Sequence, residues 1–559
     1  MNGGSNQRTG ARILVDQLRI HGVDTIFCVP GESYLATLDA LYDTREEMKL
    51  VVCRQEGGAA YMADAYGKLT GRPGICMVTR GPGATNASLG IHTARQDSSP
   101  VILFVGQVAR RMMEREAFQE VDFRHMYGPL AKWVAQIDDP ARVPEMVSRA
   151  FHVATSGRPG PVVLALPEDM QTERAVAADA KRYRPIQPAP DPAAMAELRG
   201  LLAKAKRPIM MVGGSGWTAA ACADIAAFAA ANDLPTAAAF RRQDLIDNRL
   251  PVYVGDVGLG IAPALARRLQ EADLLLVVGA QLTEVITEGY TRFEIPCPRQ
   301  TLIHVAAGID ELGKVYEPAL AINAGMPAFA AAARALAPVD PSAWRDQRKT
   351  ARADHEANVT SPPMKGAVDL GRIMRWLGDT LPDDAIVANG AGNFSNWVHR
   401  FYPYRNYGTQ LAPQSGSMGY GVPSAVAAKV VHPDRIVVSF NGDGDFLMCG
   451  QEIATANQYG LDIVFVIVNN GTYGTIRMHQ ERHYPARVVA TDLVNPDFAA
   501  LARAYGLHGE TVARTEDFAP AFERCRKAGG PALIELRVEQ DQISPRATLS
   551  GLRAAALKQ

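Results

Sequence analysis

Short apolar runs alternate with amphipathic segments along almost the whole chain, and this rhythm restricts the fold more than any other feature. Runs such as LVVC (50–53), ICMV (75–78) and VILFV (101–105) have the length of strands, and helix-length segments of mixed polarity separate them. Strands that read as continuous apolar runs are typical of parallel sheets covered by helices on both faces. The pattern predicts an α/β fold of doubly wound parallel sheets.

Proline-rich stretches interrupt this rhythm twice and divide the chain into three blocks. They are YRPIQPAPDP (183–192) and the pair ALAPVDPSAW (335–344) and NVTSPPMKG (358–366). Such stretches, without hydrophobic periodicity, are typical of linkers. We predict an N-terminal domain over residues 1–182, a central Rossmann-like domain over 190–340 and a C-terminal domain over 360–545.

Charge, cysteine usage and hydropathy exclude several classes of function. The net charge of −1 gives no basic surface for nucleic acid or an anionic membrane. Seven cysteines without a CxxC pair argue for a reducing compartment and against a disulfide framework. The longest apolar runs are too short to span a bilayer, and the N-terminus lacks the apolar core of a signal peptide. We therefore expect a cytoplasmic protein with no nucleic-acid or membrane partner.

Acidic and amide side chains follow two neighbouring strands of the third block. The run RIVVSF (435–440) leads into NGDGDF, which contains Asp443, and the run LDIVFVIV (461–468) leads into Asn469 and Asn470. Parallel strands bring their carboxyl ends to one edge of a sheet, where α/β proteins bind ligands. Two hard oxygen ligands beside a glycine turn suit Mg²⁺ that is shared with a diphosphate. A calcium loop is disfavoured, because the segment follows a strand and lacks the glutamate at the twelfth position.

These residues resemble the thiamine diphosphate (ThDP) signature of the pyruvate decarboxylase and acetolactate synthase superfamily, closest to the acetolactate synthase large subunits. The resemblance implies that the three domains bind the pyrimidine, occupy the centre and bind the diphosphate with Mg²⁺. It implies a metal site made of Asp443, Asn470 and the carbonyl group of Thr472. The implied cofactor-binding residues of this block are Gly442, Asp443, Gly444, Asp445, Asn470, Thr472, Tyr473 and Gly474.

Two further segments match the same family. In RQEGGAAYMADAYG (54–67) the resemblance makes Glu56 the group that protonates the cofactor's aminopyrimidine, and a glutamate with few polar neighbours is a poor structural choice there. In PQSGSMGYGVPSA (413–425) it makes Met418 the wedge between the two cofactor rings, with Gly416 and Met418 hydrogen-bonding the aminopyrimidine. Taken alone, Glu56 is typical of a glutamate at the start of a helix, and Met418 is typical of a methionine in a hydrophobic core.

The segment GQVARRMMEREAFQEVDF (106–123) indicates the subfamily, because GQV and AFQE resemble acetolactate synthases. The resemblance implies that Gln119 is catalytic, hydrogen-bonding substrate oxygens, and that Phe118 and Lys132 line the substrate pocket. Ile476 and His479 belong to the same pocket in this interpretation. His479 stands where the biosynthetic enzymes carry a tryptophan, so we expect an altered acceptor pocket.

The marker residues for FAD are incomplete. The family's RFDDR-like stretch is replaced by GAQLTEVITEGYTRF (279–293), and an acidic strand end is replaced by HVAAG (304–308). Only Arg158 and the Gly213-Gly214 pair remain, which leaves FAD open but poorly supported. Gln55 replaces the family's histidine before the glutamate, and no adjacent histidine pair exists, which argues against the simple pyruvate decarboxylase type.

The sequence thus predicts a ThDP- and Mg²⁺-dependent carboligase of the acetolactate synthase type. Such an enzyme decarboxylates a 2-oxo acid, most simply pyruvate, and adds the remaining unit to a second carbonyl compound. The resemblance implies a homo-oligomer with the active site at a dimer interface, a dimer or a dimer of dimers. It leaves the presence of a regulatory subunit open.

Four alternatives remain. One is a ThDP-dependent decarboxylase or lyase for another 2-oxo acid, a 2-hydroxyacyl-CoA or a sulfo-compound. Another is a flavin oxidoreductase of the pyruvate oxidase type. A nicotinamide dehydrogenase is disfavoured, because VGGSG (212–216) is not a full dinucleotide fingerprint. A non-catalytic binding protein would have no need of Glu56.

Overall fold

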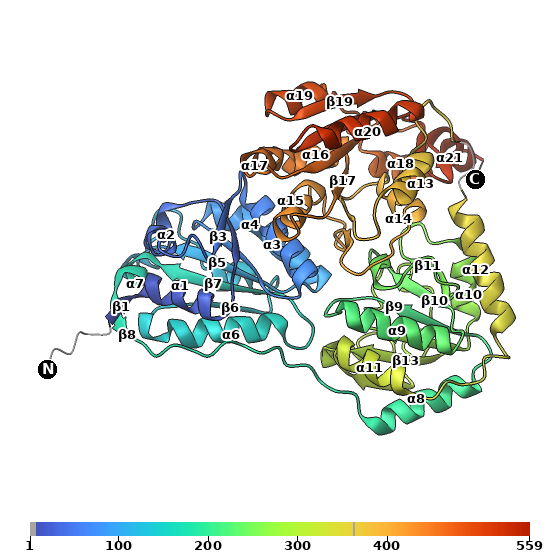
Figure 1. The fold of residues 1–559 in the computed structure, drawn as a ribbon, viewed down its shortest axis with the longest axis horizontal. Helices are drawn as coiled ribbons and strands as arrows, with labels where there is room; N and C mark the ends of the chain where they lie inside the picture. The colour runs from blue at the N-terminus through green and yellow to red at the C-terminus, as the bar shows by residue number, and fades with distance from the viewer. Residues whose placement is uncertain (1–6, 361–363, 559) are drawn as a thin grey trace. The chain divides into compact units, whose positions relative to one another are not determined.

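Three six-stranded parallel sheets flanked by helices organise the chain in the computed structural model, which describes residues 7–360 and 364–558 (Figure 1). Two short antiparallel ribbons accompany them in this part of the chain. The α/β class predicted from the sequence is confirmed. The chain divides into two compact units, Met1–Ile186 and Gln187–Gln559, which are described separately below.

The first unit holds one sheet with the strand order β3-β2-β4-β5-β7-β6. Its strands are β2 (Thr25–Cys28), β3 (Lys49–Val52), β4 (Gly74–Val78), β5 (Val101–Gln107), β6 (Trp133–Gln136) and β7 (Pro161–Pro167), and β1 (Gln7–Thr9) pairs with β8 (Arg174–Val176). Its helices are α1 (Gly10–Ile20), α2 (Leu35–Tyr42), α3 (Glu56–Thr70), α4 (Pro82–Asp97), α5 (Phe123–Tyr127), α6 (Val143–Thr155) and α7 (Glu168–Thr172). Strands β4, β5 and β7 are buried along their whole length, as their apolar runs require.

The second unit begins with a sheet of order β11-β10-β9-β12-β13-β14. Its strands are β9 (Pro208–Val212), β10 (Thr236–Ala239), β11 (Tyr253–Val257), β12 (Leu274–Val278), β13 (Thr301–Ala306) and β14 (Leu320–Asn323). Its helices are α8 (Pro192–Lys204), α9 (Ala219–Ala231), α10 (Pro263–Glu271), α11 (Met326–Ala335) and α12 (Arg345–Val359). Alternate residues of β12 enter two separate cores, Leu274 and Leu276 on one face and Leu275 and Val277 on the other, so helices bury both faces.

The same unit contains the sheet of order β16-β15-β17-β18-β20-β19. Its strands are β15 (Ile386–Asn389), β16 (Gln410–Leu411), β17 (Val437–Gly442), β18 (Ile463–Asn469), β19 (His508–Val512) and β20 (Ala532–Arg537), followed by the ribbon β21 (Gln542–Ser544) and β22 (Ala547–Thr548). Its helices are α13 (Leu370–Thr380), α14 (Ser395–Phe401), α15 (Gly421–Val431), α16 (Asp443–Cys449), α17 (Ile453–Gln458), α18 (Gly474–His483), α19 (Phe498–Ala504), α20 (Phe518–Lys527) and α21 (Leu549–Ala556).

The first and third sheets share one topology, whereas the second differs. Numbered within each sheet, the strands of the first and third run 2-1-3-4-6-5, and those of the second run 3-2-1-4-5-6, the order of the dinucleotide-binding fold. In the third sheet, successive strands are added on one side up to β16 and on the other side from β17 on. The strand order therefore reverses between β15 and β17, which are parallel neighbours. Ligands of α/β sheets bind at the carboxyl ends of such a strand pair.

The structure corrects the sequence-based account of the segment after β17. The sequence analysis places a glycine turn at NGDGDF (441–446), but α16 starts at Asp443 itself. Acidic residues in a first helical turn are favoured by the helix dipole, which explains an early start at Asp443 and Asp445. A Cβ on Gly450 would lie 2.6 Å from the Phe446 ring, and a short 3₁₀ turn there separates α16 from α17.

The predicted domain boundaries stay a prediction, but the structure shows what lies at three of them. The stretch 183–191 has no regular structure, as expected of a linker, and the two units divide inside it. The predicted end at residue 545 leaves out α21, which packs against α18. The gap between 340 and 360 contains the helix α12, which packs against β11.

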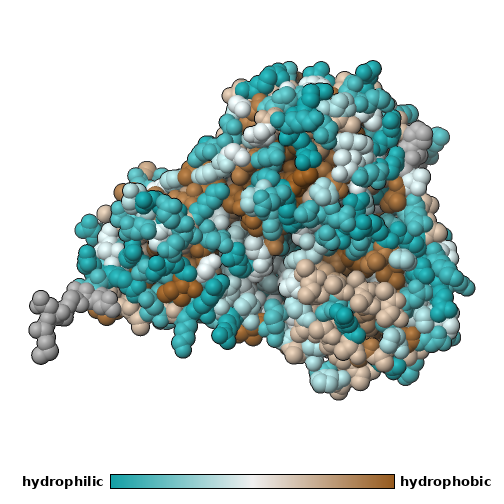
Figure 2. Space-filling model, viewed as in Figure 1, coloured by the Kyte–Doolittle hydropathy of each residue, from teal (hydrophilic) through white to brown (hydrophobic). Residues whose placement is uncertain are grey.

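The surface of the central sheet's helices is rich in alanine. Helices α9 and α11 pack against each other, and Figure 2 shows their outer side as a pale brown region. Alanine has the highest helix propensity. These segments can therefore form helices although the side chains on their outer side contribute little burial. Within residues 7–360 and 364–558, no helix combines the length and apolarity needed to cross a membrane.

Candidate active site

Asp443 and Asn470 meet at the edge of the third sheet. Strands β17 and β18 pair in parallel with Gly442 opposite Val468, so both side chains follow aligned strand ends. The Gly471 N–H donates to Asp443 Oδ2 at 2.8 Å, which ties the two strand ends together. Gly471 has a φ of +69°, a conformation that glycine adopts without strain. The structure therefore brings the two residues together.

The Asp443 carboxylate is buried and already holds several donors. Its Oδ1 accepts from the Gly444 N–H at 2.9 Å, and its Oδ2 also accepts from Asn495 Nδ2 at 2.8 Å. Burial raises the pKa of this carboxyl, and the hydrogen bonds act in the opposite direction. Asn495 Nδ2 also donates to Asn469 Oδ1 at 2.9 Å. Asn495 was not predicted from the sequence, because no motif surrounds it.

The loop after β18 contains the other two predicted metal ligands, Asn470 and Thr472. Asn470 Oδ1 accepts from the Thr472 N–H at 3.2 Å, and the Thr472 hydroxyl donates to the Thr491 carbonyl at 2.8 Å. Thr472 also forms an isolated antiparallel bridge with Asp492. A carboxylate, an amide oxygen and a backbone carbonyl are the hard ligands that Mg²⁺ prefers. The donor set thus fits the predicted metal.

One cavity of about 630 Å³ is lined by all the predicted site residues of the second unit. Its volume is within the range of small-molecule sites. Its walls include Gly416, Met418, Gly442, Asp443, Gly444, Asp445, Asn470, Thr472, Tyr473, Gly474, Ile476 and His479. Burial lowers the pKa of His479, and Arg482 and His483 lower it further, which favours a neutral ring at pH 7.

Asp445 lies at the point where the strand order of the third sheet reverses. Its Oδ1 accepts from the N–H groups of Ala391 at 3.0 Å and Gly419 at 2.8 Å. A Cβ on Gly390 would lie 2.0 Å from Asp445 Oδ2, so only glycine fits after β15. Burial raises the pKa of Asp445 to about 7. The carboxyl group fastens the turn after β15 to the segment that carries Met418.

In the first unit, Glu56 is the first residue of α3. The Gln55 side chain caps this helix by accepting from the Gly58 N–H at 2.9 Å. Glu56 is half-buried, and its Oε2 accepts from Asn86 Nδ2 at 2.9 Å. The expectation of few polar neighbours therefore missed one partner, because Asn86 comes from the neighbouring helix α4.

The turn between β4 and α4 contacts both Glu56 and Gln119. A Cβ on Gly83 would lie 3.2 Å from Glu56 Oε1, and one on Gly81 would lie 2.8 Å from the Gln119 carbonyl oxygen. Gln119 has a φ of +65°, and Phe118 is 71% exposed. The Arg80 Nε donates to the Phe118 carbonyl at 3.2 Å. The first unit thus gathers the predicted catalytic pair around one glycine turn.

Lys132 does not join this group, and the structure corrects its assignment to the substrate pocket. Its Nζ donates to the carbonyls of Val153 at 2.6 Å and Ser156 at 2.7 Å, at the C-terminal end of α6. A cation there complements the helix dipole. Lys132 immediately precedes β6, so it lies at the amino edge of the sheet, whereas Glu56 and Gln119 lie at the carboxyl edge.

Buried ion pairs attach the last helix to the cavity wall. Glu481 on α18 is fully buried, and Arg553 of α21 donates to its two oxygens at 2.8 and 2.5 Å. Arg477 Nε adds a contact at 3.2 Å. The Arg553 hydrogen bonds are the main cause that lowers the pKa of Glu481, to about 2. Helix α18 also carries Ile476 and His479, so this pair positions the predicted substrate pocket.

We predict that Glu481→Gln lowers the free energy of unfolding by about 1–3 kcal/mol at pH 7, since a buried charge-assisted pair is lost. The folded-state pKa of about 2 lies below the ordinary value of 4.5, so the stabilisation is complete above pH 4.5 and is lost as the pH falls towards 2. The difference in melting temperature between variant and wild type should therefore shrink from pH 5 to pH 3 in calorimetric scans. The exposed Glu516→Gln is the control, and a pH-independent difference would contradict the ion-pair explanation.

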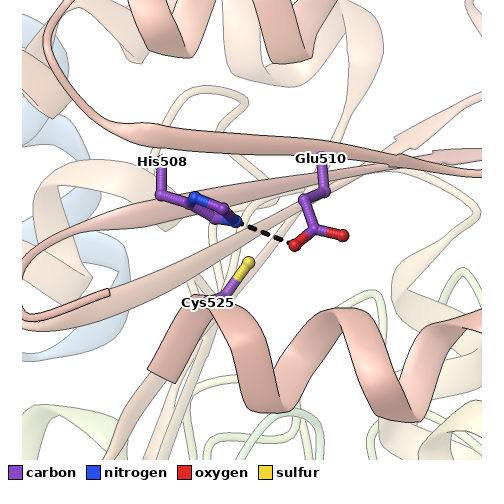
Figure 3. A group of neighbouring side chains, drawn as sticks. All are labelled: His508, Glu510 and Cys525. Carbon is purple, nitrogen blue, oxygen red and sulfur yellow. Dashed lines mark hydrogen bonds and ion pairs between the residues drawn. The ribbon is translucent and has the colours of Figure 1, made fainter. Parts of the chain in front are cut away.

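A second cluster of ligand-type side chains lies away from the cavity. His508 and Glu510 of β19 face Cys525 of α20 (Figure 3). Arg524 contacts both oxygens of Glu510, at 2.9 and 2.5 Å, and burial raises the pKa of the Cys525 thiol to about 12. A metal ion would have to displace Arg524 and remove the thiol proton. We therefore interpret this cluster as an ion-pair group that attaches α20 to the edge strand.

Comparison with known proteins identifies the family. Family models of thiamine pyrophosphate enzymes match the chain in order, with the N-terminal TPP binding domain at residues 8–126, the central domain at 195–333 and the C-terminal TPP binding domain at 390–536. An acetolactate synthase large subunit from Parasynechococcus marenigrum is 33% identical over 96% of this chain and 88% of the relative. The chain belongs to the thiamine pyrophosphate enzyme family.

Further relatives agree with this placement. The acetolactate synthase isozyme 2 large subunit of Escherichia coli is 31% identical over 95% of this chain and 96% of its own length. The large subunit from Corynebacterium glutamicum is 30% identical over 96% of this chain and 88% of its own length. This thiamine pyrophosphate enzyme thus resembles acetolactate synthases over 95–96% of its length. It uses ThDP in carbon–carbon bond chemistry.

The cavity of this thiamine pyrophosphate enzyme also has walls that the sequence analysis did not identify. These are polar and charged side chains from β11, α12, α14, α18 and the loops beside them: Arg241, Asp256, Asn358, Asn393, Asn396, His399, Arg400, Arg482 and Arg546. They come from many separate elements, and no motif marks them in the sequence.

Proposed function

We propose that this chain is a ThDP- and Mg²⁺-dependent carboligase of the acetolactate synthase type. The observation that carries the proposal is the convergence of Asp443, Asn470 and Thr472 on one cavity, beside the glycine turns of the third sheet. In this proposal those three residues hold Mg²⁺, and the N-terminus of α16 and the loop after β18 receive the diphosphate. ThDP, when bound, supplies an electron sink for the carbanion that forms as CO₂ leaves.

The proposed reaction joins two molecules of pyruvate into acetolactate and CO₂. The bond between C1 and C2 of the first pyruvate breaks, and its carboxylate leaves as CO₂. The electron pair left on C2 attacks the carbonyl carbon of the second pyruvate, whose oxygen takes up a proton. Met418 and Ile476 give the cavity an apolar section, and an apolar surrounding favours loss of the negative carboxylate.

The first unit is proposed to supply the acid–base group and the substrate-orienting amide. Glu56 would exchange a proton with the aminopyrimidine, and Gln119 would hydrogen-bond substrate oxygens. In the resembling family the two halves of the site come from different subunits, so we propose a homodimer as the minimum active unit. Leu447 and Met448 on α16 are 49% and 47% exposed, as expected of residues that a second subunit covers.

The proposal does not require FAD, which stays open but poorly supported, and the two weak markers have structural roles. A Cβ on Gly213 would lie 2.5 Å from that of Ala239, and one on Gly214 would lie 2.0 Å from the Gly279 carbonyl oxygen. These glycines therefore serve the close packing of neighbouring turns. Arg158, the other weak marker, donates to Ser98 Oγ and to the Arg95 carbonyl, both at 2.8 Å. The cytoplasmic location stays a prediction from the sequence. The sequence leaves open whether a regulatory subunit binds, although relatives are named large subunits.

The deciding experiment is to incubate the protein with ThDP, Mg²⁺ and pyruvate and to follow the products by proton NMR. Acetolactate, formed with one CO₂ per molecule, is the expected product. Untouched pyruvate in a protein that binds ThDP would contradict the proposal. It would favour the second candidate, a decarboxylase or lyase for another 2-oxo acid or a 2-hydroxyacyl-CoA, which the histidine at 479 and the charged part of the cavity wall also suit.

We predict that Gln119→Ala lowers the rate of carboligation about tenfold more than the rate of CO₂ release, because a lost hydrogen bond to the acceptor affects only the second step. Both rates can be measured in one reaction, from acetolactate and from CO₂. Gln136→Ala, in the same unit, is the control. Equal losses of both rates would count against the orienting role of Gln119.

A further inference from the structure

Two arginines lie near one another in the cavity wall, and we call this part of the wall the arginine end. Asn396 and Arg400 stand four residues apart on α14 and line the cavity. Arg546, between the strands β21 and β22, lines it as well, and both arginines donate to Asn358. A Cβ on Gly260 would lie 3.3 Å from Asn396 Oδ1, so the loop after β11 approaches α14 here. All of these groups lie in the second unit.

The hydrogen-bond partners of the two arginines are neutral. Arg546 donates to the Ile261 carbonyl at 3.0 Å and to Asn358 Oδ1 at 2.5 Å, and Arg400 Nε donates to the Asn358 carbonyl at 2.7 Å. Within residues 7–360 and 364–558 neither guanidinium forms an ion pair with a carboxylate. Arg553 and Arg524, by contrast, each hold a glutamate through two nitrogens.

Electrostatics at this end favour an added anion. Burial, and after it the neighbouring Arg546, lowers the pKa of Arg400 to about 10. Burial raises the pKa of Asp256 to about 6, so at pH 7 this carboxylate supplies one negative charge against the two positive charges of the arginines. Two guanidinium groups held close together, without a carboxylate on either, are unfavourable until an anion joins them. Their planar donors suit a carboxylate or a phosphate.

We propose that Arg400 and Arg546 bind an anionic group that the substrate keeps through the reaction, a carboxylate or phosphate distinct from the carboxylate lost as CO₂. This inference rests on the proposed function, because the proposed decarboxylation defines which carboxylate is lost as CO₂. A cation beside the departing carboxylate would stabilise the ground state and slow decarboxylation. The apolar section near Met418 and Ile476 suits that carboxylate, whereas the arginine end suits a retained anion.

The retained anion has two sources, which matched compounds separate. If the anion belongs to the acceptor, the reaction with 2-oxobutanoate should depend on the arginines. The reaction with propanal, which lacks the carboxylate, should not. If it is a second anion of the donor, 2-oxoglutarate should depend on them and 2-oxopentanoate should not. In either case we expect Arg400→Gln and Arg546→Gln to reduce kcat/KM for the charged compound roughly 10- to 100-fold, and for its neutral-tailed partner less than about threefold.

Binding gives a readout that does not need turnover. Inorganic phosphate is titrated by calorimetry into wild-type protein, Arg400→Gln, Arg546→Gln and the control Arg514→Gln, all loaded with ThDP and Mg²⁺. Arg514 is an exposed arginine that is paired with Asp517 and lies outside the cavity. We expect about tenfold weaker phosphate binding in the first two variants alone, and partial recovery in Arg546→Lys. ThDP affinity and melting temperature show whether each variant is folded.

The outcomes are distinct. Equal phosphate affinity in wild type and all variants, or equal losses within both compound pairs, would overturn the proposed anion site. If the wild-type protein releases no CO₂ from pyruvate or from any of these 2-oxo acids, the proposed function fails. Loss of phosphate binding in Arg400→Gln and Arg546→Gln would still support the anion site in that case.

Discussion

Asp443→Ala is expected to abolish retention of ThDP. The carboxylate is the only charged member of the proposed metal ligand set, and a change in the surrounding shell alone typically costs 10- to 100-fold in metal affinity. Loss of a direct ligand should therefore reduce ThDP affinity by at least about 100-fold. Calorimetric titration of ThDP at several Mg²⁺ concentrations measures this, and the variant should show no dependence on Mg²⁺.

The alanine variant also removes one of the two acceptors of the Gly471 N–H and of the Asn495 amide, which then keep only Asn469 Oδ1. Asp443→Asn separates the two effects, because it keeps the shape and one oxygen but removes the charge. Asp462→Ala is the control, because this exposed residue precedes β18 and lies at the opposite edge of the sheet from Asp443. ThDP affinity equal to that of the wild type in both Asp443 variants, with a normal melting temperature, would refute the metal assignment.

The part of this site that the sequence reveals is the part that lies at strand ends. Apolar runs locate β17 and β18, parallel pairing aligns their carboxyl ends, and Asp443 and Asn470 then have to converge. The start of α16 at Asp443 was missed because a turn and a first helical turn look alike in a segment of glycines and aspartates. Lys132 was misplaced because a matching residue type says nothing about which edge of a sheet it occupies.

The arginine end of the cavity is a different case. Arg400 lies on a seven-residue helix and Arg546 between two very short strands, and the two are brought together only by tertiary packing. Asn358, which contacts both, comes from the last turn of α12. No local pattern encodes such a meeting of three distant segments. The sequence indicates the cofactor chemistry, and only the structure shows that Arg400, Arg546 and Asn358 meet in the cavity wall.

Glu56→Gln is expected to lower kcat by about 10²- to 10⁴-fold, the usual contribution of a positioned acid–base group. Glutamine keeps an oxygen that can accept the hydrogen bond from Asn86, so folding should be unaffected. ThDP affinity should change less than about threefold, because the amide still fits the same space. Steady-state kinetics and calorimetry test both statements, with the exposed Glu46→Gln as the control. Unchanged turnover would refute the catalytic role of Glu56.

The same variant tests whether subunits share the site. If Glu56 of one subunit acts on the cofactor held by Asp443 of another, a heterodimer of Glu56→Gln and Asp443→Ala contains one doubly damaged site and one intact site. Co-refolding equal amounts of the two inactive variants should then restore about a quarter of the wild-type activity, because half of the dimers are mixed and each has one working site. If each subunit held a complete site, every site would keep one defect. The mixture would then stay inactive, and the proposed interface would be wrong.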